Sequence, residues 1–365
     1  MRHHALVLAL TVVAPGLTVA VASAATPAPA QAPAASSRAA VGTGEPARTG
    51  PGAASAQTSA RAQAVHTVGG CQVFPADNPW NTRIDDRPVL NRSAKIISRQ
   101  AAGHPVHLDL GSTEEYYGIP VTVVPEAQAT FPPASAWEAR TTPTRATRDR
   151  CPSSRGAHRG GSTGDPDPSG GDRHVVVVRQ GGGCRLIETY KTKRAYDDQG
   201  AVVAFKAAAA ARWDLDSNAL RPKGRTSADA AGLPILPGLL DYDEAASGQI
   251  THALRFTLPD ARFAYTWPAR HCGPRGNTAR TLPAYGLRFR LKASVSATRY
   301  TGAARAIVRA MKRYGLVYAD QGSAMYVTGT SDPRWADALD QFRARPLDGS
   351  KFEVVKPFRK IHACG

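Results

Sequence analysis

The chain has 365 residues, of which 42 % are hydrophobic and 7 % aromatic, and it carries a net charge of +17 at pH 7. Beyond the first 24 residues no stretch is apolar and long enough to span a bilayer, which excludes membrane insertion of the remaining chain. The sequence also contains no zinc finger, recognition helix or base-stacking signature, so its positive charge does not indicate a nucleic-acid module.

Residues 1–24 have the three parts of a secretory signal peptide. Arg2 precedes an apolar run from Ala5 to Val21, and small residues follow at positions −3 and −1 of a cleavage site before Ala25. The apolar run is near or below the length needed to cross a bilayer and is interrupted by a Pro-Gly pair. A cleaved signal is therefore favoured over a membrane anchor, and we expect a secreted, extracellular protein.

Residues 25–66 consist almost wholly of Ala, Pro, Ser, Thr, Gly and Gln and contain no aromatic residue. Such a segment buries too little apolar surface to offset its ordering entropy, so we expect a disordered linker. Residues 67–365 are then one folded domain, in which the Arg-, Gly-, Pro- and Ser-rich stretch 139–172 is expected to be a mobile insertion. The first 66 residues hold four arginines and one glutamate, so +14 of the net charge belongs to this domain.

All five cysteines lie beyond the linker. Export to an oxidising compartment predicts two disulfides with one cysteine left over, and the absence of any CxxC spacing disfavours a zinc knuckle. The pairing is open, although the positions near the two domain ends suggest that Cys71 and Cys364 each fasten a terminus. The cysteines are Cys71, Cys151, Cys184, Cys272 and Cys364.

Two β-rich runs around a glycine turn form the first clear element. HVVVV (His174–Val178) and CRLIETY (Cys184–Tyr190) flank the turn RQGGG, which is typical of a β-hairpin. In the second run Glu188 alternates with Leu186 and Tyr190, so its carboxylate is predicted to lie on a largely apolar face. Carboxylates in such positions are usually paired or functional.

A second hairpin is predicted further along the chain. ITHALRFTL (Ile250–Leu258) alternates strictly, with His252 on the apolar face and Arg255 on the opposite one. RFAYTW (Arg262–Trp267) alternates as well and is expected to pair with it in antiparallel fashion. Because the two faces point apart, His252 and Arg255 line one cleft only if a bulge intervenes.

The strand predicted for Leu287–Ser294 places Arg288, Arg290 and Lys292 on one face. We expect this exposed basic stripe to contact an anionic polymer through interactions that weaken with salt.

Helices are few. Residues 303–314 have helical periodicity, a small hairpin is predicted at 316–319 and 324–329, and a last helix is expected between residues 331 and 342. Many short strands with Gly- and Pro-rich turns indicate a mainly β protein. We predict an antiparallel β-sandwich of jelly-roll type with a few peripheral helices.

The chain contains seven longer motifs: CQVFPADNPWN, GDRHVVVV, WDLDSNALRPKGRTSADAAGLPILPGLLDYDE, THALRFT, WPARH, LRFRLKAS and YVTGTSDPRW. Together they resemble an uncharacterised family of secreted, mainly actinobacterial proteins. The resemblance covers most of the chain between Cys71 and Trp335 and implies an extracellular single-domain protein, but it implies no activity and no catalytic residues.

The stretch Thr226–Phe256 combines four carboxylates, a histidine and an arginine. Asp241 and Glu244 have the spacing of a capping box, which accounts for Glu244 as the N3 residue of a short helix. Capping explains Asp229 less well, because neighbouring Thr and Ser residues can already cap that turn. His252 is either a core histidine or a group facing a ligand.

Three functions compete on these residues. A polysaccharide hydrolase would use Glu188 as an acid in an apolar setting, Asp229 or Asp214 as its partner, and His252 beside them. A polyuronate lyase would neutralise the sugar carboxylate with Arg or His while Tyr or His removes a proton. A non-catalytic binder of cell-wall glycan needs only charge and a concave sheet. The residues expected to contact substrate are His174, Asp214, Tyr265, Trp267, Arg270 and His271.

The glycan-acting hydrolase is favoured because polar residues recur at positions predicted to face inward. No cofactor and no metal are expected. A metal site formed by His174, Glu188 and His252 is disfavoured because the HxH pattern of a cupin-like site is absent. The expected partner of the monomeric protein is a polysaccharide or an anionic cell-wall polymer.

Overall fold

The computed structural model describes the chain from residue 66 onward, with gaps. The described residues are 66–111, 117–128, 130–131, 151–152, 171–199 and 202–365. They all belong to one compact unit, Ala60–Gly365. The expected signal peptide lies outside the described residues, as do the expected linker apart from His66 and most of the expected insertion at 139–172.

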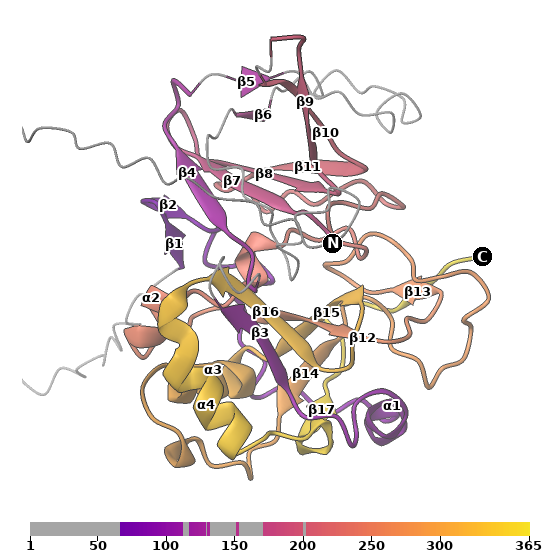
Figure 1. The fold of residues 1–365 in the computed structure, drawn as a ribbon. Coiled ribbons are helices and arrows are strands. Elements are labelled where there is room, and N and C mark those ends of the chain that lie inside the picture. The colour runs from indigo at the N-terminus through magenta and orange to yellow at the C-terminus, as the bar shows by residue number, and fades with distance from the viewer. Residues whose placement is uncertain (1–65, 112–116, 129, 132–150, 153–170, 200–201) are drawn as a thin grey trace, which may run out of the picture. The chain divides into compact units, whose positions relative to one another are not determined.

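The protein is mainly β, as predicted, and its largest sheet has six strands (Figure 1). In order across the sheet, the strands are β17 (Phe352–Val354), β14 (Arg288–Leu291), β15 (Leu316–Gln321), β12 (Leu254–Leu258), β16 (Tyr326–Ser331) and β3 (His107–Gly111). The pairs β12–β15 and β16–β3 are parallel, whereas the other pairs are antiparallel. The sheet is therefore mixed, which corrects the expectation of a wholly antiparallel arrangement.

A second sheet has four strands, in the order β11 (Ala209–Asp214), β8 (Arg185–Tyr190), β7 (Val175–Arg179) and β4 (Val121–Val124). The hairpin predicted around the glycine turn is confirmed, because β7 and β8 pair in antiparallel register with Val176 opposite Glu188. Gly181, Gly182 and Gly183 all have positive φ angles, between 44° and 95°. This conformation is accessible to glycine at little steric cost, which explains the glycine run.

The hairpin predicted between Ile250–Leu258 and Arg262–Trp267 is wrong. The small hairpin predicted at 316–319 and 324–329 is wrong as well, because β12 lies between β15 and β16. The strand β12 begins only at Leu254 and lies inside the six-stranded sheet, where β15 and β16 occupy both of its hydrogen-bonding edges. The short strand β13 (Ala264–Tyr265) pairs instead with β18 (His362–Ala363). The remaining two-stranded pairs are β1 (Thr67–Val68) with β2 (Cys71–Gln72), β5 (Thr130–Phe131) with β6 (Cys151–Pro152), and β9 (Lys193–Tyr196) with β10 (Val202–Lys206).

The described residues form four α-helices beside the sheets: α1 (Ser93–Gln100), α2 (Tyr242–Ala246), α3 (Gly302–Arg313) and α4 (Ala336–Ala344). The predictions of α3 and α4 are confirmed. The two helices pack against each other, α3 against β14 and α4 against β3 (Figure 1). Short 3-10 helices occur at η2 (Leu236–Gly238), η3 (Ala297–Arg299), η4 (Pro333–Trp335) and η5 (Gly349–Lys351). No helix in the described part of the chain has the length and hydropathy to cross a membrane.

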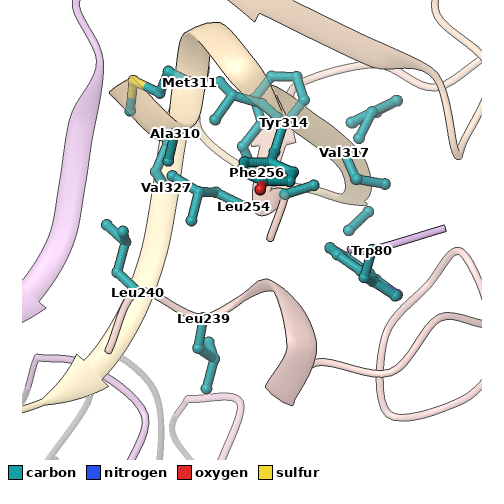
Figure 2. Close-up of a cluster of buried hydrophobic side chains, with 14 of the residues drawn as sticks. Trp80, Leu239, Leu240, Leu254, Phe256, Ala310, Met311, Tyr314, Val317 and Val327 are labelled. Atoms are coloured by element: carbon teal, nitrogen blue, oxygen red, sulfur yellow. The ribbon is translucent and has the colours of Figure 1, made fainter. Parts of the chain in front are cut away.

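One large cluster of buried hydrophobic side chains includes residues of both sheets and of α3. Figure 2 shows Leu254 and Phe256 of β12 close to Ala310 and Met311 of α3. The ring of Phe256 lies 4.9 Å from that of Phe289 on β14, in an edge-to-face arrangement. This core holds the backbone of β12 in place. The strand carries Arg255 and begins two residues after His252.

The two predicted disulfides are confirmed, and they use four of the five cysteines. Cys71 of β2 is bonded to Cys184, and Cys272 is bonded to Cys364. Each disulfide thus joins a cysteine near one end of the sequence of the compact unit to a cysteine far from that end, as suggested for Cys71 and Cys364.

Candidate functional site

Glu188 lies in the interior of the protein, with a side chain that is 0 % exposed. Its Oε1 accepts hydrogen bonds from the backbone N–H groups of Ile235 and Leu236 at 2.9 and 2.8 Å. Burial raises the pKa of the Glu188 carboxyl to about 7, and the two backbone donors oppose this shift. The carboxylate therefore caps the 3-10 helix η2 from the neighbouring sheet, and these contacts account for its place on an apolar face.

Asp229 and Arg255 form a buried ion pair. The Arg255 Nη2 donates to Asp229 Oδ2 at 3.0 Å, and its Nη1 donates to the Thr328 hydroxyl at 2.7 Å. Asp229 Oδ1 accepts from the Ala231 N–H at 3.1 Å. Burial raises the pKa of Asp229 well above its usual value, while the charge of Arg255 opposes that shift. Asp229 and Arg255 are 1 % and 5 % exposed, so the pair connects the loop before η2 to the six-stranded sheet.

His252 belongs to a third buried group, together with Glu244 and His66. Its Nε2 lies 2.9 Å from Glu244 Oε2, and its Nδ1 donates to the Ala253 carbonyl at 2.8 Å. The ring of His66 stacks on that of His252 with centroids 4.5 Å apart. Burial alone would lower the pKa of His252, but the facing Glu244 carboxylate raises it above its usual value. Of the two alternatives for His252, the structure thus shows a buried histidine, and it contacts a carboxylate.

The side chains of three further predicted residues bind backbone or neighbouring groups. The buried His174 has its Nδ1 3.3 Å from the Thr189 carbonyl oxygen. Arg270 donates from Nε to the Arg221 carbonyl at 2.7 Å, and His271 Nδ1 lies 2.9 Å from the carbonyl oxygen of Ala230. The contacts of Arg270 and His271 hold together the loops on either side of Asp229 in the sequence, whereas that of His174 lies within the β7–β8 hairpin.

The remaining predicted residues lie apart from Glu188 and His252. Asp214 forms an ion pair with Arg185 at 2.8 Å on the four-stranded sheet. Tyr265 is buried with its ring 4.9 Å from that of His362, and the half-buried Trp267 ring lies 5.6 Å from that of Phe358. Glu188 and Asp229 therefore lie close enough to Arg255 to interact with its charge. Asp214, Tyr265 and Trp267 contact other residues instead.

The prediction of an exposed basic stripe on β14 is wrong for Arg288, because this side chain is only 2 % exposed. Its guanidinium donates to the carbonyl oxygens of Pro79, Thr82 and Tyr314, because the segment before α1 covers this face of the strand. Arg290 is half-buried and forms a 2.6 Å ion pair with Glu353. A basic surface does exist nearby, but most of its charge comes from other elements.

This surface is a recess of about 450 Å³ beside α3, which we call the cationic recess. Five cationic side chains and two carboxylates line it, which gives a net charge of +3. Sequence patterning predicted the helix at 303–314 but missed this surface as a site. The recess is lined by Arg83, Asp85, Arg290, Leu291, Ala293, Ala297, Arg309, Lys312, Arg313 and Glu353.

A larger recess of about 690 Å³ lies between β3 and α4. Leu108, Leu110, Tyr117 and Phe342 make much of its lining apolar, and its charged residues are of both signs. None of the nine predicted site residues lines either recess.

The candidates within the described part of the chain are thus three buried polar groups and the cationic recess. The polar groups are those of Glu188, of Asp229 with Arg255, and of His252 with Glu244 and His66. The comparisons with known proteins add no assignment: no family model, no curated protein and no solved structure matches the chain.

Proposed function

We propose that the protein is a non-catalytic binder of an anionic polymer, and that the cationic recess is its binding site. The observation that carries this proposal is the concentration of five cationic side chains around a cavity of about 450 Å³. A cavity with an excess of positive charge attracts anionic groups, since its low-dielectric walls focus the field.

Two cations of the recess are held in place by hydrogen bonds to backbone carbonyls. Lys312 Nζ donates to the carbonyl oxygens of Ala293 and Val295 at 2.9 and 2.7 Å. Arg290 Nη1 donates to the Ile84 carbonyl at 2.7 Å, besides its guanidinium's contacts with Glu353. Such side chains lose little rotamer freedom when a ligand binds, which improves affinity.

Arg309 and Arg313 are the groups that we expect to contact the ligand directly. They lie four residues apart on α3, on the same side of the helix, and both are exposed. Neither forms an ion pair within the described part of the chain. Guanidinium groups bind phosphate and carboxylate in bidentate fashion, so the ligand class is a chain that repeats one of these groups, such as a teichoic acid or an acidic polysaccharide.

The predicted extracellular location and the positive charge of the domain agree with this ligand class, because such polymers occur at cell surfaces. The hydrolase hypothesis has weaker support from the geometry. Glu188 and Asp229 are 0 % and 1 % exposed, and backbone N–H groups and Arg255 already occupy their oxygens. Two carboxylates that act on a glycosidic bond must both reach the sugar between them.

Binding of the secreted chain to immobilised polyphosphate, polygalacturonate and neutral dextran tests the proposal. We expect binding to one or both polyanions, a steep loss of affinity with salt, and no binding to dextran. The variant Arg309→Gln/Arg313→Gln should bind much more weakly, and its slope of log affinity against log salt should be smaller by roughly 1–2.

The matched control is Lys95→Gln/Arg99→Gln, which removes two exposed charges at the same spacing from α1. If this control weakens binding as much as the α3 variant does, the charge of the whole protein binds the polymer and the recess is not the site. Release of reducing ends or of unsaturated sugar from any polymer would contradict the non-catalytic assignment.

A further inference from the structure

Three potential metal ligands from distant parts of the chain meet in the interior. His66 directly precedes β1, Glu244 lies on α2, and His252 lies just before β12. One ligand atom from each of them lies within 4.8 Å of the other two. His66 and His252 are 5 % and 0 % exposed, and the Glu244 side chain is 12 % exposed.

Contacts around the cluster orient two of the three ligand atoms. The Nδ1–H of His252 donates to the Ala253 carbonyl at 2.8 Å, which directs Nε2 toward the cluster. Glu244 Oε1 accepts from the Thr251 N–H at 2.9 Å and from its hydroxyl at 3.2 Å, which directs Oε2 toward the same point. Histidines and carboxylates that bind metals are usually held by such hydrogen bonds through their other polar atom.

His66 is the member of the cluster whose burial is not offset by a side-chain hydrogen bond to any described residue. Neither of its ring nitrogens has a hydrogen-bond partner among the described residues, although both are buried. Its Nε2 lies 3.9 Å from Glu244 Oε2, which is too long for a hydrogen bond. A buried polar group without a partner costs on the order of 1–3 kcal/mol, so a bound ligand at this place would stabilise a neutral imidazole.

We propose that His66, Glu244 and His252 bind a divalent transition-metal ion, with Zn²⁺ as the first choice. Two imidazoles and one carboxylate are a ligand set that zinc uses, with a water molecule as the fourth ligand. Bonds of about 2.0–2.1 Å at tetrahedral angles place neighbouring ligand atoms about 3.3 Å apart. The distances from Glu244 Oε2 to the two Nε2 atoms, 2.9 and 3.9 Å, bracket this value.

The pKa shifts of His66 and Glu244 favour metal binding, whereas the raised pKa of His252 means that the metal must displace a proton from its ring. Burial and the neighbouring His252 lower the pKa of His66 to about 3, so its ring is neutral and has a free lone pair at neutral pH. Burial alone would raise the pKa of Glu244, but the facing His252 lowers it to about 2, so its carboxylate is ionised.

A metal at this place would fasten the N-terminal end of the compact unit. His66 is joined to β2 through a 2.8 Å hydrogen bond from the Val73 N–H to its carbonyl oxygen, and β2 carries the disulfide from Cys71 to Cys184. The metal would add a second connection, from the same segment to α2 and to the residues before β12. Ion binding would therefore increase folding stability.

The experiment uses the full chain, treated with a chelator and dialysed, with both disulfides oxidised. Zn²⁺ affinity is measured by competition with a chromogenic chelator, and the absorption spectrum of added Co²⁺ reports its coordination geometry. The variants are His66→Gln and Glu244→Gln, and His104→Gln is the control because His104 is exposed.

We expect one Zn²⁺ per chain, a tetrahedral Co²⁺ spectrum, and a melting temperature that rises with Zn²⁺. Loss of a hydrogen bond that supports a metal ligand costs about 10–100-fold in affinity. Because His66→Gln and Glu244→Gln remove a ligand itself, each should weaken Zn²⁺ binding by more than this. His104→Gln should bind as the unchanged protein does. If the protein does not bind Zn²⁺, or binds it equally in all four proteins, then Glu244 and His252 form only an ion pair beside His66, and the proposal is wrong.

Discussion

At the scale of single residues, the buried carboxyl group of Glu188 ties folding stability to pH. Its pKa in the folded protein is raised to about 7, against a usual value of 4.5. Between these values the folded state binds the proton more strongly than the unfolded state does. The contribution of the group to stability is therefore complete below about pH 4.5 and is lost as pH rises through 7, by an amount on the order of 3 kcal/mol.

We expect Glu188→Gln to reduce this dependence, because the amide does not ionise and its oxygen still accepts from the η2 backbone. The melting temperature of the unchanged protein should fall more between pH 5 and pH 8 than that of the variant. The exposed carboxylate Glu126 provides the control, since Glu126→Gln should leave the dependence unchanged. Equal falls for all three proteins would show that Glu188 does not set the pH dependence.

The sequence predicted an apolar setting for Glu188 and His252, but it predicted neither the burial of Asp229 and Arg255 nor the partners of any of the four. Alternation along β8 placed Glu188 on an apolar face, which the structure confirms. Its partners Ile235 and Leu236 come from a loop that no local pattern connects to β8. The capping spacing is confirmed only for the Glu244 backbone, whose N–H donates to Asp241 at 3.1 Å, while the Glu244 side chain turns to His252.

At the scale of elements, local patterns predicted strands better than they predicted pairing. The hairpin of β7 and β8 was predictable because a glycine turn fixes its register. The strand β12 shows why the pattern failed elsewhere, since it pairs with β15 and β16, which lie more distant in the sequence than β13. Period-2 alternation shows that a strand has two different faces, but it contains no information about the neighbouring strand.

Gly329 allows β16 to approach β3 and the segment around Leu240 closely. A Cβ atom at this position would meet the Leu110 side chain of β3 and would lie 2.9 Å from the Leu240 carbonyl oxygen. We expect Gly329→Ala to lower the free energy of unfolding by about 1–3 kcal/mol, because the backbone must shift. Gly322→Ala is the control, since a Cβ there would lie 3.2 Å from the Thr257 side chain. Similar melting temperatures for the two variants would contradict this reading of β16.

At the scale of the whole molecule, the disulfides are expected to dominate stability. The Cys71–Cys184 bond closes a sequence separation of 113 residues, and the Cys272–Cys364 bond one of 92. Loops of this length predict a stabilisation of up to about 4–5 kcal/mol each in the chain-entropy model. Replacing both cysteines of either pair by serine should therefore lower the melting temperature markedly, by a similar amount for the two pairs. A difference of less than a few degrees from the unchanged protein would contradict this expectation.

The parallel pairing of β3 with β16 has a consequence for how the chain folds. This pairing joins residues 107–111 to residues 326–331, so the edge of the large sheet forms only when nearly the whole chain is present. Contacts of such high sequence separation slow folding, because a long loop must close before they form. Before β3 and β16 pair, the edge of β16 that faces β3 is free, and strands of other chains can pair with it. The interval between emergence of the chain and docking of β3 is thus the period in which this protein is most exposed to aggregation.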